Sequence, residues 1–381
     1  MTLTSPHRAA ARLRPVEVAE AATVASVSQL VEQVLAALRN DWAELTANAM
    51  PGEPVEPPGY RGLRTDSVLD LLGGLVATGG KRFRPRMAYW GWVAGGGHSA
   101  GRGQAELVRV GAALELLHVF ALIHDDVMDG SETRRGQASV HAAARREHVR
   151  QRGLGEAQRY GENIAILAGD LAHSEAGVLV AGLPAPMQQL WRTLAIELMM
   201  GQGRDLVGAA NGRRDLDHAR GVARAKSGAY TVWRPLQLGA AAAGASPATM
   251  AALERYGIAA GEAFALRDDI LGVVGDHRDT GKPVGDDLAT GKPTVLMALA
   301  AERFSLRWRR ALERAAAGRA TNAELTALRA ELVRSGVIAQ VEAMIAEAVA
   351  EARSALADPA VHPDAVDGLA ALVRRMAWRA A

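Results

Sequence analysis

The sequence predicts an all-α protein, built as a single large bundle of roughly a dozen helices. Apolar residues recur at helical spacing along most of the chain, whereas Val, Ile and Thr never alternate at the period of two that is typical of strands. Alanine is abundant and only 4% of residues are aromatic, which favours close packing of helices over a sheet. Because 49% of the 381 residues are hydrophobic, the chain can bury a sizeable core.

The expected elements follow one another along the chain. Residues 1–24 are expected to form a disordered tail, and residues 25–381 a single all-α domain. An amphipathic helix is predicted over Val27–Asn48, and the Pro- and Gly-rich stretch Met50–Gly62 is a connection. Further helices are predicted over Ser67–Ala77, Met87–Val93, Gln104–Met128, Asn163–Val180, Pro186–Met200 and Pro247–Ile270, with two or three more between Glu324 and Met376.

The composition excludes several classes of function. There are no cysteines, so disulfides, thiolate metal sites and cysteine nucleophiles are ruled out. A formal net charge of +2 without a clustered basic patch gives no reason to expect a nucleic-acid partner. We expect a cytoplasmic protein, since a reducing compartment is compatible with this composition.

No membrane span is predicted, because no stretch of eighteen uncharged apolar residues occurs. The best candidate, Val108–Ile123, is interrupted by Arg109, Glu115 and His118. The Arg-rich N-terminus lacks the apolar segment of a secretory signal. It is interpreted as the disordered tail, with a transit peptide as the alternative.

Three aspartates end the helix that is predicted over Gln104–Met128. Asp125 and Asp129 lie one turn apart on one face, while Asp126 points about 100° away. Each acid at a helix C-terminus costs from a few tenths to about 1 kcal/mol, because that end carries partial negative charge. The cluster is therefore either a solvated acidic end or a place where cations bind. Carboxylate oxygens suit Mg²⁺, which takes one or two carboxylates together with substrate phosphates.

A second acidic helix end occurs far along the chain. Asp268 and Asp269 lie near the end of the helix predicted over Pro247–Ile270, and Asp276 follows them. If the two ends face each other, they can hold a diphosphate between several Mg²⁺ ions.

Basic residues form separate groups near these acids. Arginine binds phosphate oxygens in a bidentate fork, and lysine binds them as a point charge. The combination of acid pairs with basic groups suggests two diphosphates, one held through metal and one held directly. The basic residues are Lys81, Arg82 and Arg84 in a glycine-led turn, Arg134 and Arg135 after the first acids, and Lys226, Lys282 and Lys292 further on.

Several motifs in order resemble the trans-isoprenyl diphosphate synthases, or polyprenyl synthetases. The first acidic segment, DDVMDGSETRRG, is similar to the family motif DDxxDxxxxRRG, and RDDILGVVGD is similar to its second Asp-rich motif. The remaining matches are GGKRFRP (GKxxRP), GQGRD (GQxxD) and GKPVGDDLATGKPT (the lysine-rich segment), and together the motifs span Gly79–Thr294. The resemblance implies a helical bundle of the isoprenoid synthase type around a deep central cavity.

The resemblance also implies roles for individual residues. Metal ligands would be Asp125, Asp129 and Asp268, with Asp126 and Asp269 as supporting catalytic acids. Isopentenyl diphosphate would be bound by Lys81, Arg84, His118 and Arg135. The allylic diphosphate and the reacting centre would be lined by Arg134, Lys226, Gln202, Asp205, Lys282 and Lys292, of which Lys226 would also be catalytic. The implied cofactor is Mg²⁺, roughly three ions per site, with Mn²⁺ as a substitute.

The implied reaction condenses isopentenyl diphosphate with dimethylallyl, geranyl or farnesyl diphosphate. The product expected from the resemblance is all-trans geranylgeranyl diphosphate, made by a homodimer. Aromatic Phe120, small Ala121 and the absence of an insertion in DDVMD look like the short-chain geranylgeranyl synthases. On the helical wheel Ala121 lies directly below Asp125, whereas Phe120 points about 140° away, so only the resemblance assigns Phe120 to chain length.

Two departures from the family pattern keep alternatives open. Gly272 stands where the second motif usually has its last aspartate, and Ala265 follows Phe264 where a glutamine is common. These changes favour a non-catalytic partner subunit, whereas the intact first motif favours an enzyme. A farnesyl or longer-chain synthase and a terpene cyclase are further alternatives. A cyclase would not need the second diphosphate pocket of Lys81 and Arg84, and the cyclase pattern NDxxSxxxE is absent.

Overall fold

The structure is a computed structural model that describes residues 15–48, 62–98, 101, 103–275, 288 and 292–379. Helices dominate this part of the chain, so the all-α prediction is confirmed. The helices of the first half are α1 (Pro15–Ala47), α2 (Ser67–Ala77), α3 (Phe83–Ala94), α4 (Gln104–Asp129), α5 (Val140–Arg150), α6 (Ala157–Ala181) and α7 (Ala185–Ala210). Those of the second half are α8 (Leu216–Val222), the π-helix η1 (Ala223–Trp233), α9 (Arg234–Ala243), α10 (Pro247–Val274), α13 (Val295–Arg303), α14 (Leu306–Ala316), α15 (Asn322–Arg334), α16 (Val337–Ala355) and α17 (Pro363–Ala377).

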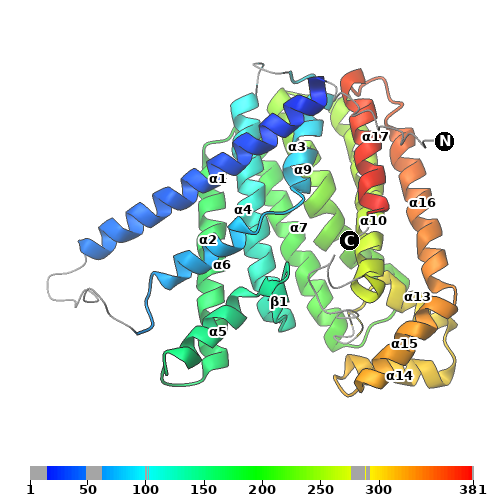
Figure 1. Cartoon of the computed structure of the whole chain (residues 1–381). Coiled ribbons are helices and arrows are strands. Elements are labelled where there is room, and N and C mark those ends of the chain that lie inside the picture. The colour runs from blue at the N-terminus through cyan, green and yellow to red at the C-terminus, as the bar shows by residue number, and fades with distance from the viewer. Residues whose placement is uncertain are drawn as a thin grey trace, which may run out of the picture.

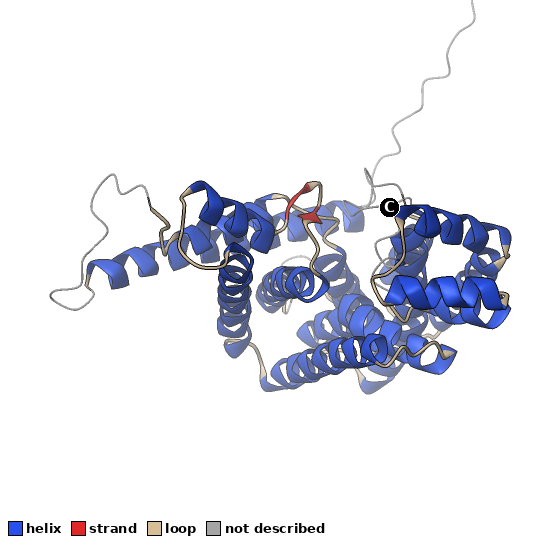
Figure 2. Cartoon of the chain, turned by 90° about the horizontal axis from the view of Figure 1, so that it is seen from below, coloured by secondary structure: helices blue, strands red, loops and turns tan. Residues whose placement is uncertain are grey.

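The long helices run side by side, with α1 crossing them at one side and the C-terminal helices α14–α17 at the other (Figure 1). Seen from below, several helices are viewed almost end-on, as expected of a bundle (Figure 2). A single short hairpin, β1 (Thr133–Arg134) paired antiparallel with β2 (Gln137–Ala138), interrupts the helices within the described ranges. The architecture therefore consists almost entirely of helices, and the side chains packed between them form the core.

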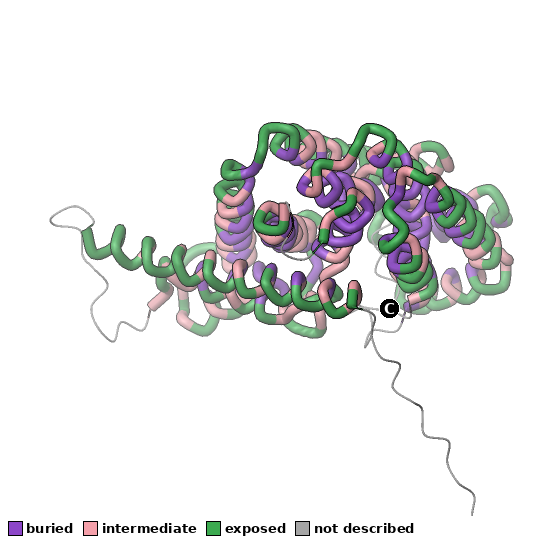
Figure 3. Tube along the Cα trace, turned by 90° about the horizontal axis from the view of Figure 1, so that it is seen from above, coloured by how far each residue is buried: buried purple, intermediate pink, exposed green. Residues whose placement is uncertain are grey.

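α4 is the central helix of the bundle. It packs against α6, α3 and α1, and its residues from Val110 to Leu117 are all buried. Figure 3 shows this contrast in burial, with buried positions on the inner helices and mostly exposed positions along α1. A helix that is apolar on nearly every side must be surrounded by other helices, and α4 therefore carries its acidic end into the interior of the molecule.

The predicted tail extends too far, because α1 already begins at Pro15. Proline is favoured in the first turn of a helix, and Glu17 complements the positive end of the helix dipole there. Glu20 and Thr23 are buried, and the Glu20 carboxylate accepts a hydrogen bond from Arg86 of α3 at 2.8 Å. This contact attaches the first turns of α1 to α3. Residues 1–14 lie outside the described residues.

Three helices are long and apolar enough to cross a membrane by length and composition, namely α1, α4 and α6. In the fold, 61% of the most apolar window of α4 is buried among other helices, compared with 17% for α1 and 33% for α6. From the sequence no membrane span is expected, because charged residues interrupt the apolar segments. That expectation stays a prediction.

Candidate active site

The first acidic cluster lies where α4 ends. Gly130 adopts a left-handed conformation with φ of 65°, and its amide donates to the carbonyls of Asp126 and Val127. Left-handed glycine is a common helix terminator, since it has no Cβ to clash with the backbone. The Ser131 amide also donates to the Asp126 carbonyl, at 2.9 Å. The chain therefore turns directly after Asp129 and enters the β1–β2 hairpin, which carries Arg134 and Arg135 back towards the helix end.

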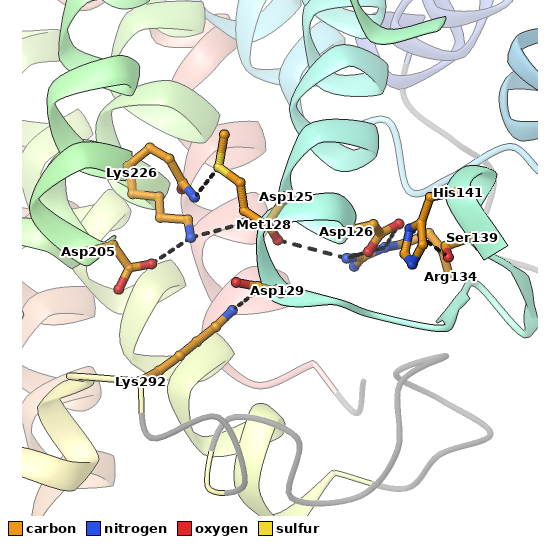
Figure 4. Close-up of polar contacts among 11 residues, drawn as sticks. Asp125, Asp126, Met128, Asp129, Arg134, Ser139, His141, Asp205, Lys226 and Lys292 are labelled. Atoms are coloured by element: carbon orange, nitrogen blue, oxygen red, sulfur yellow. Dashed lines mark hydrogen bonds and ion pairs between the residues drawn. The ribbon is translucent and has the colours of Figure 1, made fainter. Parts of the chain in front are cut away.

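The three acids of α4 have different partners (Figure 4). Asp125 accepts a hydrogen bond from the Lys226 ammonium group at 3.1 Å. Asp129 accepts one from Lys292 at 2.6 Å. Asp126 is buried and accepts two hydrogen bonds from Arg134 Nε at 3.0 and 3.1 Å. Asp125 and Asp129 thus contact cations from distant parts of the chain, whereas Asp126 holds the neighbouring arginine.

The ion pair between Asp126 and Arg134 fixes the hairpin. Burial is the largest single influence on Arg134 and acts to lower its pKa, but the carboxylates of Asp126, Asp125 and Asp129 together outweigh it and raise the pKa. Asp125 lies 3.8 Å from the same guanidinium group. Asp126 does not line the cavity described below, whereas Arg134 does. Asp126 therefore positions Arg134, and its supporting role in catalysis stays a prediction.

Lys226 lies on the π-helix η1, an element that is rare and often occurs at functional sites. A Cβ added at Gly201 of α7 would lie 2.6 Å from the Lys226 backbone nitrogen, so glycine permits this close contact. One turn further along α7, Asp205 accepts a hydrogen bond from the Lys226 ammonium group at 2.6 Å. Burial lowers the pKa of Lys226, yet Asp125 and Asp205 outweigh it and raise the pKa above its usual value. Lys226 therefore stays charged although it is largely buried.

The second acidic cluster lies near the end of α10. Asp269 accepts a hydrogen bond from the Val295 amide at 3.0 Å, at the N-terminus of α13. The Thr294 side chain caps the same helix start, so the loop end that contains Lys292 is attached to α10. Asp268 forms an ion pair with Arg379 near the C-terminus of the chain.

One cavity of about 940 Å³ joins the two clusters. Asp125 of α4 and both Asp268 and Asp269 of α10 line it, and Gly272 lies in the same wall. Most of the predicted cationic side chains line it as well, namely Lys81, Arg84, Arg134, Arg135, Lys226 and Lys292. The structure therefore brings the two predicted acidic ends and the basic groups to the same cavity, although Asp125 and Asp268 are more than a hundred positions apart in the sequence.

The predicted isopentenyl diphosphate residues form one wall of this cavity. Arg84 is buried, with its guanidinium group 3.9 Å from the Tyr230 ring centroid and a hydrogen bond to the Thr231 hydroxyl at 2.8 Å. Arg135 donates to the Thr78 hydroxyl at 3.1 Å, and a Cβ at Gly80 would lie 3.0 Å from its guanidinium group. The second glycine of GGKRFRP therefore leaves room for Arg135.

His118 and Tyr230 form a hydrogen bond of 3.0 Å in the same wall. Burial, followed by the nearby charges of Arg84 and Arg135, lowers the pKa of His118 well below its ordinary value. Burial also raises the pKa of Tyr230. Both side chains are therefore neutral near pH 7 and can offer hydrogen bonds beside the charged arginines.

Several cavity residues were not predicted from the sequence. Tyr230 and Thr231 hold Arg84, and the buried Glu115 forms an ion pair with Arg82. Arg379 lines the cavity but lies far from every motif. A signal for Tyr230 existed in its spacing of four residues from Lys226, which places both on one side of a helix.

Other predicted residues have varied positions. Gln202 and Asp205 line the cavity, and the Gln202 amide lies 3.2 Å from the Met128 sulfur. Ala121 also lines it, whereas Phe120 is not among the lining residues. The Phe120 ring instead packs against His124 and His173, with centroids 4.5 and 4.9 Å apart. Lys282 and Asp276 lie outside the described residues.

The chemistry of the donors suits a hard divalent cation. Asp125, Asp268 and Asp269 contribute only carboxylate oxygens to the cavity, and oxygen is the ligand that Mg²⁺ prefers. Among the residues that the structure describes, no three acidic or histidine side chains come together as a preformed metal site. Mg²⁺ commonly takes one or two carboxylates and completes its shell with water and substrate phosphates, so the residues fit Mg²⁺ that arrives with a diphosphate.

Comparisons with known proteins agree with this geometry. The geranylfarnesyl diphosphate synthase of Aeropyrum pernix is 34% identical over 242 residues, which cover 61% of this chain and 70% of that protein. The geranylgeranyl diphosphate synthase of Mycobacterium tuberculosis is 35% identical over 226 residues, 58% of each chain. The crystal structure of a geranylgeranyl pyrophosphate synthase from Corynebacterium glutamicum, complexed with isoprenyl diphosphate and magnesium, matches with a TM-score of 0.83 and 34% identity, covering 93% of this chain and 97% of that one.

The polyprenyl synthetase family model matches residues 66–332. This range includes both acidic helix ends and the predicted cationic groups from Lys81 to Lys292. With the match to the family model, the relatives and the shared fold, the chain belongs to the polyprenyl synthetase family and is a prenyltransferase.

Proposed function

We propose that the protein condenses isopentenyl diphosphate with an allylic diphosphate in an Mg²⁺-dependent reaction and makes all-trans geranylgeranyl diphosphate. The observation that carries this proposal is the single cavity that is lined both by the carboxylates of Asp125, Asp268 and Asp269 and by the cationic side chains of Lys81 and Arg84. Carboxylates that bind metal and cations that bind phosphate directly are the two kinds of group that two diphosphate substrates require.

The residues around Asp125 suit the allylic diphosphate. Mg²⁺ supplies positive charge that stabilises the diphosphate as it leaves. Lys226, 3.1 Å from Asp125, and Arg134, 3.8 Å from it, stand beside the same carboxylate and bind the phosphate oxygens. As the bond between the allylic carbon and the diphosphate oxygen breaks, these cations stabilise the negative charge that develops on the oxygen.

A second group of cavity residues positions the second substrate. Lys81, Arg84 and Arg135 bind isopentenyl diphosphate, so that its double bond attacks the allylic cation and a new carbon–carbon bond forms. Holding both reactants in one cavity makes the step effectively unimolecular. A proton then leaves the condensed product, and the departing diphosphate accepts it. The apolar cavity residues, including Leu122, Leu198 and Val222, exclude water that would otherwise quench the cation.

The chain-length preference rests on the wall below Asp125. Ala121 lines the cavity and leaves room for a growing prenyl chain. The named relatives include both geranylgeranyl and geranylfarnesyl synthases, so a longer product is the second candidate. Incubating the purified protein with Mg²⁺, isopentenyl diphosphate and each allylic diphosphate, and then measuring product length, tests the proposal. A C20 product supports it, whereas cyclic products or no products contradict it.

We further propose a cytoplasmic homodimer without a nucleic-acid partner. The support for a second copy is a set of exposed apolar residues, since such surface is often an interface. These residues are Ile166, Leu167 and Val178 on α6 and Ile196, Met199, Met200, Leu206 and Val207 on α7. Light scattering after gel filtration should give twice the mass of the 40.1 kDa chain, and a monomer at micromolar concentration would contradict the dimer.

A further inference from the structure

Arg379 is an unassigned residue that contacts one of the predicted metal ligands. It follows α17, which packs against α3 and α10 and brings the end of the chain beside the end of α10 (Figure 1). There its guanidinium group forms an ion pair with Asp268 and lines the cavity. Nothing in the sequence around it predicts this contact, because 111 residues separate the two partners.

Arg379 has further contacts that hold it independently of Asp268. Its guanidinium group lies 4.3 Å from the Phe264 ring centroid and 5.9 Å from that of Phe83, and the two rings meet edge to face. It also donates a hydrogen bond to the Met376 carbonyl at 2.8 Å. Only 10% of the Arg379 side chain is exposed, compared with 47% for Asp268. Aromatic faces attract guanidinium groups, so the arginine can remain near the cavity when it is not paired with Asp268.

The position of this cation matters for metal binding. A carboxylate paired with a guanidinium group attracts Mg²⁺ less strongly, since the positive charges repel each other at close range. Asp125 and Asp129 also contact cations, but Lys226 and Lys292 lie within the matched family region, whereas Arg379 lies outside it. The second acidic end also has one motif acid fewer than the first, because Gly272 stands where the family motif has an aspartate.

We propose that Arg379 is an internal counter-ion that competes with Mg²⁺ for Asp268 and thereby sets the Mg²⁺ concentration that the protein requires. The inference rests on the proposed function, in which Asp268 is a metal ligand. When a metal–diphosphate complex binds, Arg379 releases Asp268 and stays on the rings of Phe264 and Phe83. No covalent step is involved.

The test is calorimetric titration of Mg²⁺ into the full-length protein at a fixed concentration of inorganic pyrophosphate. Arg379→Gln should lower the half-saturating Mg²⁺ concentration about two- to fivefold, the effect expected of a partly exposed ion pair. Arg379→Lys, which keeps the charge, should stay close to wild type. Arg375→Gln is the matched control, since Arg375 is an exposed arginine in the last turn of α17. A melting temperature for each variant detects a purely structural effect.

The outcomes separate this inference from the proposed function. An unchanged or higher half-saturating Mg²⁺ concentration in Arg379→Gln would overturn the proposal that Arg379 competes with Mg²⁺ for Asp268. Asp268→Asn should weaken metal–pyrophosphate binding, and if it does so while Arg379→Gln has no effect, only the counter-ion fails. If Asp268→Asn binds metal and pyrophosphate as strongly as wild type, Asp268 is not a ligand and the second end of the proposed site fails as well.

Discussion

The two acidic helix ends of the cavity differ in how they are supported. At the end of α4, Asp126 is buried on Arg134, while Asp125 contacts Lys226 and Asp129 contacts Lys292. At the end of α10, Asp269 accepts a hydrogen bond from the start of α13, and Asp268 pairs with a residue at the very end of the chain. The first end thus combines the neighbouring Arg134 with two lysines from distant parts of the chain, whereas the second is held by the start of α13 and by the far end of the chain.

This difference indicates a division of labour within one site. At the first end, Asp125 and Asp129 lie on one face of a helix that a glycine terminates, and Asp126 lies on another face, where it binds Arg134 of the hairpin. The second end has Gly272 where the family motif has a third acid, whereas the first end retains all three acids of its motif. We therefore expect the first end to dominate catalysis and the second to tune the metal requirement.

The largest effect is expected at Asp125. Asp125→Ala removes the carboxylate that the first end contributes to the cavity and leaves Lys226 with Asp205 alone, so the rate of product formation should fall by about a hundredfold to a thousandfold or more. Steady-state kinetics with saturating Mg²⁺ measure the change, and circular dichroism checks that the fold is retained. Asp217→Ala, at an exposed acid of α8, is the control. Near-normal turnover in Asp125→Ala would rule out the role given to this helix end.

The next largest effect is expected in the wall one turn before Asp125. Ala121→Phe fills cavity space where the prenyl chain should grow, and the main product should shift from C20 to a shorter diphosphate. Phe120→Ala tests the assignment that comes from family resemblance, and longer products are expected if the growing chain reaches the ring. Mass spectrometry of the products measures both variants. An unchanged product length in Ala121→Phe would contradict a role for the cavity wall at Ala121 in setting chain length.

A smaller effect is expected from restoring an acid to the second end. Gly272 lies one turn beyond Asp268 on the same side of α10, so Gly272→Asp adds a carboxylate to the cavity wall. The half-saturating Mg²⁺ concentration should fall about threefold, since added ligand charge strengthens the binding of a divalent cation. Gly272→Asn has a similar size without the charge and should not reproduce the effect. Equal metal requirements in the two variants would show that the second end does not limit metal binding.

The smallest effect concerns His118 and acid stability. Because the pKa of His118 is lowered in the folded protein, the unfolded chain binds more protons below its ordinary pKa of about 6.5. The contribution of His118 to the free energy of unfolding is therefore complete above this pH and is lost as the pH falls below it. His118→Gln should make the decline between pH 7 and 5 shallower, by at most about 1.4 kcal/mol per pH unit. Urea unfolding across this range measures the slopes, and identical slopes would contradict the shift.

Much of the fold and of the site follows from local sequence. Helical spacing and the stop at Gly130 predict α4 to within one residue of its observed end at Asp129. Residues one turn apart on a helix share a face. Helix geometry therefore predicts that Asp125 and Asp129 point the same way, as do Asp268 and Gly272. The meeting of these two ends in one cavity followed only from the family resemblance, because packing between distant helices leaves no local signal.

The segment after Met200 shows where prediction from sequence failed. α7 continues to Ala210 and is followed by α8, η1 and α9, none of which was predicted. The glycines at 201, 203 and 208 lower helix propensity, but Gly201 is needed where η1 approaches α7. Arg379 was missed for a different reason, since its partner Asp268 is brought close only by the packing of α17 against α10.

The central claim is that both acidic helix ends hold one diphosphate through divalent ions. The most direct measurement is a crystal structure with Mn²⁺ and inorganic pyrophosphate, in which anomalous scattering locates the metal. The account predicts Mn²⁺ peaks beside Asp125 and beside Asp268, with a single pyrophosphate between them. Metal at only one helix end, or pyrophosphate bound by cations alone, would contradict it.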